Sequence, residues 1–452
     1  MIKKSTLVVV LCALILGAAA YYFEQRQERK SKPPEDTTKP AFSISASEVT
    51  SFTLSHPTKP GEPPIRFEKR NGAWKILQPV ETEADEPTAQ GIVDQLAEAR
   101  VSETFPGGPD RRKAYGLDPP QSSIEFQLQN GAKHSLLIGD KDFAGSSVYT
   151  IVDGAQTVSL LPESLSSSAG KSLDDLRDRA VLHLDNGNVA SFVLKNPGGE
   201  LDITRDKGDW KFSNPASALA DKDSVDSLLS MLATAKMASI ASERPENLSR
   251  YGLASPAVTF TATTNSGQKS TLHVGSKDGD TYFARDPSRT TVFRIQKDLY
   301  TKLTQKFGEL RDKKVVRFAS DDVQQVHIES ANGALTASRK KDAPDEWMMD
   351  APVDQKGKSV SSWKFLDPIG NLKAEEVIDH PAADLVAALA KPAVTVVLTA
   401  KNGQQTTVRI SKPSGDFAYA QVTGNSALFK LKKQAVTDLS FKPADLVLAI
   451  TN

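Results

Sequence analysis

Three Ser-x-x-Lys pairs are the first residues in this sequence whose types and spacing could do chemistry. A lysine three residues after a serine can act as the base that activates a serine nucleophile. The pairs are Ser168 with Lys171, Ser338 with Lys341, and Ser361 with Lys364. Three matches in a chain rich in serine and lysine indicate background, and no second catalytic motif accompanies them. The sequence therefore predicts no catalytic serine, and we expect that the protein is not an enzyme.

Nucleotide chemistry is suggested by one short segment. Gly170-Lys171-Ser172 resembles the end of a phosphate-binding loop, in which a lysine and backbone amides hold phosphate groups. That loop also needs a glycine five residues before its second glycine, and Leu165 stands at that position. The sequence predicts no nucleotide site, and we expect no cofactor.

Metal-binding residues do not gather in the sequence. Asp221, Asp223 and Asp226 precede a predicted helix, but the glycine and terminal glutamate of a calcium-binding loop are absent. Acidic residues in a first helical turn are explained by helix capping and by the helix dipole. No two of the six histidines are two or four residues apart, and Cys12 is the single cysteine. We expect no metal site.

Tryptophan could serve binding, because exposed aromatic rings stack on sugars. Three of the four tryptophans, however, stand in a recurring segment, each five residues before a proline. A residue kept at one place in every copy of a segment is more economically a core residue that buries a large apolar surface. Trp363 has no such counterpart and is the candidate for a surface contact. The recurring pairs are Trp74 and Pro79, Trp210 and Pro215, and Trp347 and Pro352.

The recurring segment belongs to an internal repeat. Three sets of residues are each spaced by 136 positions, which gives a repeat of about that length in three copies. The predicted organisation is an N-terminal segment 1–23, a polar linker 24–45, and units 46–180, 181–316 and 317–452, the last divergent. The three sets are Pro120, Pro256 and Pro392; Gly131, Gly267 and Gly403; and Ile138, Val274 and Ile410.

Each unit is long enough to be a domain with its own core. In the first unit we predict strands at 49–54, 65–68 and 74–77, then a helix whose apolar face runs from Ile92 to Val101, then four strands. The class is α+β, with mostly antiparallel strands and one or two helices in each unit.

These segments resemble the bacterial family called domain of unknown function 4340. The resemblance rests on the Trp-to-Pro segment, on Tyr-Gly-Leu before a proline, on a strand that ends in an apolar residue and glycine, and on a closing Leu-Arg-Asp-Arg or Leu-Arg-Asp-Lys. Members are often encoded beside ABC-2-type transporter subunits and gliding-motility-like proteins, which implies an accessory role and no established activity. The third unit departs from the pattern, with Ala-Ala-Leu for Tyr-Gly-Leu and 439–442 for the closing segment.

The closing segments lie at the boundary where one unit ends and the next begins. Arg177 and Asp178 end the first unit, and Arg311 and Asp312 end the second. The third unit, which no further unit follows, has neither. Because the planar guanidinium fork of arginine binds carboxylates and carbonyls well, we predict that these residues fix the junctions between units.

The N-terminus carries a topological signal. An uncharged run from Ser5 to Phe23 follows Lys3 and Lys4 and is long enough to cross a bilayer. The flanking lysines predict that the rest of the chain lies outside the cytoplasm. A cleaved signal peptide is the alternative, because Ala18-Ala19-Ala20 fits a cleavage site and would release a secreted protein.

Composition narrows the function further. The formal net charge is zero, so the chain lacks the basic excess of a nucleic-acid-binding protein. We expect a single-pass protein of the bacterial inner membrane whose body is a periplasmic scaffold for an ABC-type transporter or envelope assembly. The alternative is an envelope glycan-binding protein or hydrolase with a site between units.

Overall fold

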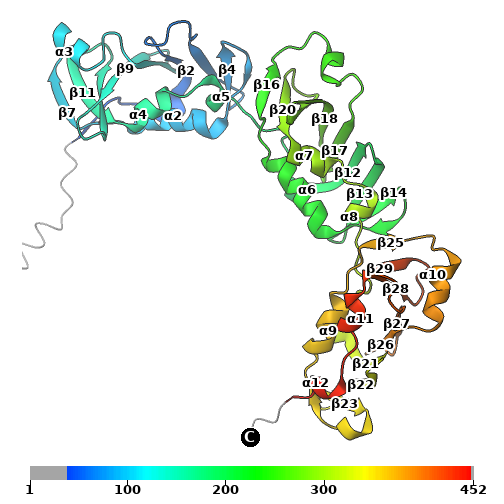
Figure 1. The fold of residues 1–452 in the computed structure, drawn as a ribbon. Coiled ribbons are helices and arrows are strands. Elements are labelled where there is room, and N and C mark those ends of the chain that lie inside the picture. Colours follow the sequence, from blue (N-terminus) through cyan, green and yellow to red (C-terminus); the bar gives the residue numbers. More distant parts are fainter. Residues whose placement is uncertain (1–37, 449–452) are drawn as a thin grey trace, which may run out of the picture. The chain divides into compact units, whose positions relative to one another are not determined.

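Three nine-stranded sheets follow one another along the chain (Figure 1). The computed structural model describes residues 38–448. Hydrogen-bonded neighbours in each sheet are antiparallel. Tandem repeats and a β-rich, antiparallel fold are therefore confirmed. We name the sheets and their helices repeats 1, 2 and 3, while the predicted boundaries at 180 and 316 stay predictions. The chain divides into two compact units at Arg179, and the second unit holds repeats 2 and 3.

Repeat 1 is built from a sheet with helices on one of its faces. In spatial order its strands are β5 (Thr82–Glu83), β4 (Ala73–Gln78), β3 (Ile65–Arg70), β2 (Val49–Ser55), β8 (Ser122–Leu128), β9 (Lys133–Lys141), β10 (Ser147–Val152), β11 (Thr157–Pro162) and β7 (Glu103–Pro106). Its helices are α2 (Glu86–Glu98), α3 (Pro109–Ala114), α4 (Ser164–Ala169) and α5 (Leu173–Leu176), and β1 (Lys39–Pro40) pairs separately with β6 (Arg100–Val101).

Local sequence explains these elements. In β8 alternate side chains are buried, as strands with one solvated face require. Asp85 caps the N-terminus of helix α2, because its carboxylate accepts a hydrogen bond from the Thr88 amide at 3.1 Å. The prediction that Val101 lies on the helix face is wrong. The helix ends at Glu98, because the chain turns extended at Ala99 and continues into β6.

Repeat 2 has the same order of elements. Its strands, in spatial order, are β15 (Ala218–Leu219), β14 (Asp209–Asn214), β13 (Gly199–Asp206), β12 (Val189–Asn196), β17 (Val258–Thr264), β18 (Lys269–Asp278), β19 (Thr281–Arg285), β20 (Val292–Gln296) and β16 (Ser239–Ser242). Its helices are α6 (Lys222–Thr234), α7 (Lys297–Leu303) and α8 (Phe307–Leu310).

Repeat 3 keeps the sheet but changes the helices. Its main helix, α9, has 8 residues, whereas α2 and α6 have 13 each. Its strands are β24 (Ser359–Val360), β23 (Ala343–Ala351), β22 (Gly333–Lys340), β21 (Val323–Ser330), β26 (Val394–Ala400), β27 (Gln405–Ile410), β28 (Phe417–Val422), β29 (Leu428–Lys432) and β25 (Glu376–Ile378). Its helices are α9 (Trp363–Gly370), α10 (Ala383–Ala387), α11 (Gln434–Asp438) and α12 (Pro443–Leu446).

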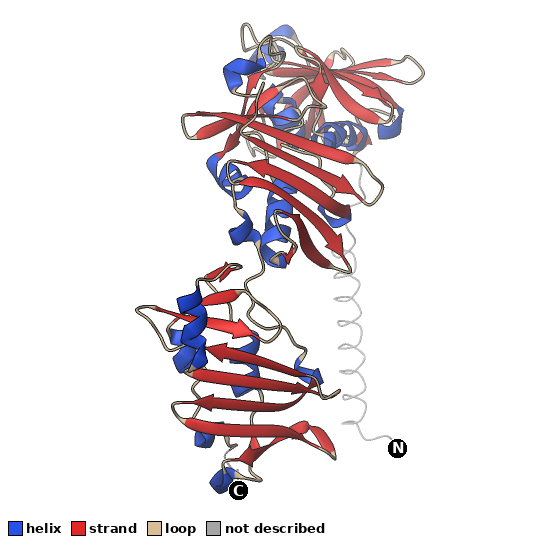
Figure 2. Cartoon of the chain, turned by 90° about the vertical axis from the view of Figure 1, so that its right-hand side faces the viewer, coloured by secondary structure: helices blue, strands red, loops and turns tan. Residues whose placement is uncertain are grey.

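The number of helices differs from the sequence prediction. Short helices of four to seven residues accompany the main helix of each repeat, which is more than the one or two predicted. These segments are too short to show a helical period in the sequence. Some of them pack against the core: Leu165 of α4 and Leu303 of α7 are buried, as is Leu439, which follows α11. Figure 2 shows the strands of each repeat as one sheet with helices against it.

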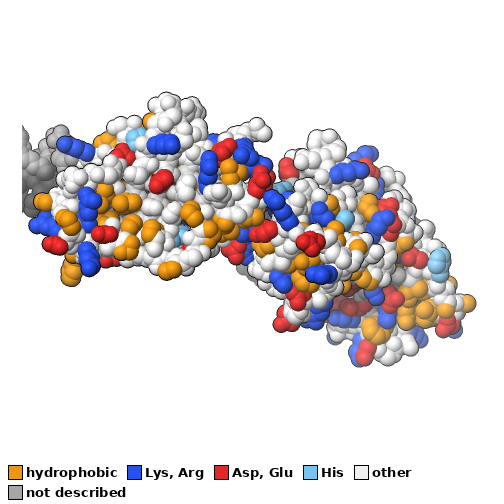
Figure 3. Space-filling model, turned by 90° about the horizontal axis from the view of Figure 1, so that it is seen from above, with side chains coloured by type: hydrophobic (Ala, Val, Ile, Leu, Met, Phe, Trp, Pro, Cys, Tyr) orange, Lys and Arg blue, Asp and Glu red, His pale blue; other side chains and the backbone are white. Residues whose placement is uncertain are grey.

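The surface matches the neutral composition. Lysine and arginine side chains are interspersed with aspartate and glutamate over the face drawn in Figure 3. Among the described residues, no helix is both long and apolar enough to cross a bilayer. The predicted anchor, Ser5 to Phe23, lies outside those residues, as does most of the predicted linker.

Candidate functional site

The tryptophans of the repeat lie in the cores. Trp74 and Trp210 are each 1% exposed and Trp347 is 2% exposed. The indole nitrogen of Trp210 donates to the carboxylate of Asp226 at 3.0 Å, and Asp226 lies within α6 rather than before it as predicted. The prolines of these segments, Pro79, Pro215 and Pro352, follow strands β4, β14 and β23, each through a cis peptide bond.

The Tyr-Gly-Leu segment and the glycine that was predicted to end a strand form one structural feature. The prediction of a strand end is wrong, because Gly139 lies within β9 and Gly275 within β18. A Cβ on Gly139 would lie 2.2 Å from the carbonyl oxygen of Tyr115, and one on Gly275 would lie 2.0 Å from that of Tyr251. Real Cβ atoms do not approach a carbonyl oxygen so closely, so only glycine fits there. Leu117 of the first segment is then buried, 3% exposed, over the outer face of the sheet. Both motifs are explained by packing.

The closing segments bind the edge of their own sheet through the backbone. In repeat 2 the Asp221 amide donates to the carbonyl of Leu310 at 2.7 Å, and the Asp312 amide donates to that of Leu219 at 2.9 Å. In repeat 1 the amides of Asp85 and Asp178 make the same two bonds, to Leu176 at 2.8 Å and to Glu83 at 2.9 Å.

Repeat 3 repeats this backbone pattern at a place that the sequence comparison missed. The Ser361 amide donates to the carbonyl of Leu446 at 3.1 Å, and the Leu448 amide donates to that of Ser359 at 2.9 Å. The prediction that 439–442 corresponds to the closing segment is therefore wrong. The true counterpart, 446–448, was hidden because it keeps the leucine and loses both charged residues.

We use the term exit face for four positions of each repeat. Two of them directly follow the closing leucine. The third is the residue before the main helix whose amide donates to the carbonyl of that leucine, and the fourth lies two residues after this third position. In repeat 2 all four side chains are charged. The exit face comprises Asp85, Pro87, Arg177 and Asp178 in repeat 1; Asp221, Asp223, Arg311 and Asp312 in repeat 2; and Ser361, Trp363, Val447 and Leu448 in repeat 3.

Two ion pairs between residues far apart in the chain join the exit face of repeat 2 to repeat 3, and a third, between Asp312 and Arg317, joins residues of the connection itself. Arg311 Nη1 lies 2.6 Å from Asp379 Oδ2, and Lys373 Nζ lies 2.7 Å from Asp221 Oδ2. The two pairs have opposite polarity, since repeat 2 supplies the cation of one and the anion of the other. Such a crossed arrangement selects one relative placement of the two surfaces.

The pKa values reflect these pairs. The hydrogen bond to Asp221, together with the charges of Asp221, Asp312 and Asp223, raises the pKa of Lys373 against the opposing effect of burial. Burial by itself would raise the pKa of Asp221, but the hydrogen bonds from Lys373 and Ser224 outweigh it and the pKa is lowered. Both groups are therefore held in their charged forms at neutral pH.

The remaining junction residues are placed as follows. Asp312, whose side chain is 9% exposed, accepts from the Lys314 amide at 3.1 Å and pairs with Arg317 at 2.7 Å. Arg177 has a side chain that is 5% exposed, and its Nε lies 3.2 Å from Asp174 Oδ1 within repeat 1. Its role at a junction stays a prediction.

Sequence reasoning missed Lys373 and Asp379. One signal could have found the lysine, because a cation occupies the matching position in every repeat. In each repeat, this cation pairs through a β-bridge with a residue of the chain segment that leads into the repeat. The pairs are Arg100 with Pro40, Lys236 with Ala180, and Lys373 with Lys314.

Comparison with known protein families assigns the chain to one of them. Its sequence matches the profile described as domain of unknown function (DUF4340) in two segments, residues 74–214 and 210–392, which together span more than half of the chain. The chain belongs to this family. No curated protein matches the sequence. The two segments cover the Trp-to-Pro, Tyr-Gly-Leu and Leu-Arg-Asp motifs of repeats 1 and 2, so the DUF4340 pattern consists here of core and edge-closing residues.

Several candidate catalytic and metal-binding residues of this DUF4340 member have other structural contacts. Ser168 is buried in α4, and Lys364 Nζ donates to the carbonyl of Asp445 at 2.7 Å. The carboxylate of Asp221 accepts a hydrogen bond from Lys373, and that of Asp226 accepts one from the indole nitrogen of Trp210. Within residues 38–448, no three His, Cys, Asp or Glu side chains are placed to hold a metal ion.

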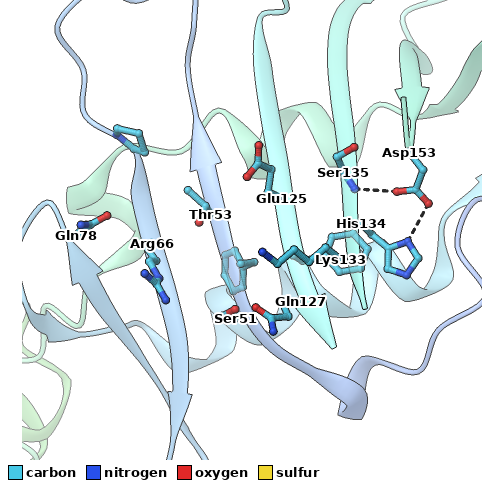
Figure 4. A pocket seen from close by; sticks show the side chains of 13 residues that line it. Ser51, Thr53, Arg66, Gln78, Glu125, Gln127, Lys133, His134, Ser135 and Asp153 are labelled. Atoms are coloured by element: carbon cyan, nitrogen blue, oxygen red, sulfur yellow. Dashed lines mark hydrogen bonds and ion pairs between the residues drawn. The ribbon is translucent and has the colours of Figure 1, made fainter. Parts of the chain in front are cut away.

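An open depression of about 830 Å³ lies on the solvated face of the repeat 1 sheet (Figure 4). Thr53, Arg66, Glu125 and Lys133 line it, and Asp153 bonds to His134 Nδ1 at 2.8 Å at one end. Polar side chains are the ordinary complement of an antiparallel sheet with one face in water. The exit face, which joins two repeats, is the stronger candidate for function.

Proposed function

We propose that this DUF4340 protein is a membrane-anchored, extracytoplasmic scaffold that serves an ABC-type transporter or another envelope assembly. The observation that carries the proposal is the pair of crossed ion pairs, Arg311 with Asp379 and Lys373 with Asp221, which links consecutive repeats at fixed positions. A scaffold needs repeats that keep their relative placement, whereas an enzyme needs converging reactive groups.

Two further features support the proposal. The uncharged run from Ser5 to Phe23 behind Lys3 and Lys4 favours a single-pass anchor in the inner membrane, with the repeats on the far side. The gene neighbourhood typical of the resembling family favours a protein partner such as an ABC-2-type permease. Lipid contact would come from the anchor alone.

A fusion of alkaline phosphatase after residue 40, followed by purification from membranes, tests this function. We expect an active fusion, because the enzyme folds only outside the cytoplasm, and recovery of a permease with the full chain after cross-linking in native membranes. An inactive fusion would contradict the proposed topology. A soluble periplasmic protein that begins at Tyr21 would replace the tether with a cleaved signal, and full recovery of the chain without a partner would contradict the scaffold.

A further inference from the structure

Repeats 2 and 3 share a surface hollow at the same place in each repeat. Its volume is about 400 Å³ in repeat 2 and about 460 Å³ in repeat 3. The walls correspond, because Thr264 pairs with the first residue of β12 as Ala400 pairs with the first residue of β21. Three pairs of corresponding wall residues are Leu182 and Val316, Gln268 and Gln404, and Ser270 and Thr406.

Repeat 1 carries aromatic rings of its own at the corresponding positions. His134 corresponds to Ser270 and Thr406, because all three pair with the same position of the neighbouring strand. Phe42 corresponds to the first pair of wall residues, because each follows the amide that bonds to a carbonyl just after the main helix. The centroid of the His134 ring lies 5.6 Å from that of Phe42 and 5.2 Å from that of Phe126. Repeat 1 therefore shows which kind of group this place accommodates.

The walls of the hollows suit an aromatic ring that comes from outside. Leu398 and Val316, which line the hollow of repeat 3, are 4% and 5% exposed, so they belong to the apolar core beneath it. Gln404 and Thr406 supply polar groups beside this apolar floor. A phenyl, phenol or imidazole ring is flat and rigid, so it buries a large area and loses little conformational entropy.

The hollow of repeat 3 adjoins the connection between repeats 2 and 3. Arg317, which lines the hollow, pairs with Asp312 at 2.7 Å. A group seated there would therefore lie beside an interface that the protein already uses. Trp363, the candidate for a surface contact, is 64% exposed and lines neither hollow.

We propose that the hollows of repeats 2 and 3 each bind an aromatic side chain of a protein partner. The partner then supplies the ring that repeat 1 supplies from its own chain. One ring gives a weak contact, but two sites on one chain raise the overall affinity when both are engaged. This inference rests on the proposed function, because it names the chemistry by which the partner of the scaffold is recognised.

Saturation-transfer NMR of the full chain tests the proposal, with N-acetyl-phenylalanine amide as the probe. The double variant S270H/T406H copies the ring of repeat 1 into both hollows, and S270A/T406A is the matched control that keeps them open. We expect transfer to the ring protons with the native chain and with S270A/T406A, and at least a threefold loss with S270H/T406H. An excess of N-acetyl-leucine amide, which lacks a ring, should not displace the probe.

A photoreactive probe locates the site without any variant. N-acetyl-4-benzoyl-phenylalanine amide should cross-link the native chain at 182–185 and 316–319, which line the two hollows and which mass spectrometry can identify.

Three results would overturn the proposal. The first is cross-links confined to other segments, and the second is transfer that a folded S270H/T406H, checked by circular dichroism, leaves unchanged. The third is displacement by the leucine amide, which would show a site for any apolar group, such as a lipid chain. These readouts are independent of the alkaline phosphatase fusion, so an active fusion without probe binding would reject this inference and keep the proposed topology.

Discussion

Repeats 2 and 3 solve the same packing problem in two ways. In repeat 2 the Tyr-Gly-Leu segment crosses the sheet at Gly275, and Gly252 has a φ of +68°. In repeat 3 Ser411 occupies the corresponding place, and its hydroxyl accepts from the Tyr419 amide at 3.0 Å. Ser411 is buried, and its hydroxyl also donates to the carbonyl of Lys412 at 3.0 Å.

The leucine of the segment is buried in both repeats. Leu253 is 4% exposed and Leu389 is 5% exposed, although repeat 3 replaces the crossing loop by α10 and a turn of 3₁₀ helix. The buried leucine is therefore a requirement of the fold, whereas the pair of glycines is only one of two local structures that place the leucine there. A conserved motif in two repeats therefore does not by itself indicate a binding site.

Buried and exposed tryptophans should give the largest contrast between the repeats. W210A removes a core side chain and should lower the free energy of unfolding of repeat 2 by about 3–5 kcal/mol. W363A removes an exposed side chain and should change that of repeat 3 by less than about 0.5 kcal/mol. Amide hydrogen exchange of the full chain reports each repeat separately. Equal loss of protection in both variants would mean that Trp363 is a core residue as well.

A methyl group at the crossing point should give the next largest effect. G275A places a Cβ 2.0 Å from the Tyr251 carbonyl oxygen, and the overpacked backbone should cost about 1–3 kcal/mol in repeat 2. G308A is the matched control, because a Cβ there meets nothing within 4 Å. Chemical denaturation should separate the two variants, and equal stability of G275A and G308A would refute the close approach.

The sequence predicted the repeats and their cores well. Gly267 recurs at intervals of 136 residues and Trp210 at intervals of 136 and 137, because every copy needs the same hairpin turn and the same buried tryptophan. Alternation along strands such as β8 follows from one buried and one solvated face. Short strands such as β5 and β7 were not predicted, because a strand of two to four residues is too short to show an alternating pattern.

The junction was predicted only in part. Arg311 was visible as half of a recurring motif, but its partner Asp379 lies 68 residues away in a segment without a motif. The counterpart in repeat 3 was misplaced, because the equivalence is carried by backbone hydrogen bonds of Leu446 and Leu448 and not by side-chain identity. Pairings of this kind are set by the fold and leave no local pattern.

The ion pairs at the junction should have the smallest effect on stability and a clear effect on geometry. Each pair has one well-exposed partner, Asp379 or Lys373, and surface pairs contribute only ~0–1 kcal/mol, so the double variant D221N/R311Q should fold with nearly unchanged stability. The crossed pairs define the polarity of the contact between repeats 2 and 3, so we expect their removal to loosen the relative placement, although the pair of Asp312 with Arg317 stays in place. A loss of fixed placement without a loss of folding is what a scaffold junction predicts.

The most direct test is the distance distribution between two spin labels, one on each repeat. Lys269 and Lys401, which are exposed in hairpins of repeats 2 and 3, can carry the labels after replacement by cysteine in a C12S background. Our account predicts a narrow distribution for the otherwise native chain and a clearly broader one for D221N/R311Q. A distribution that is equally narrow in both proteins would contradict the claim that these charges hold the repeats in place.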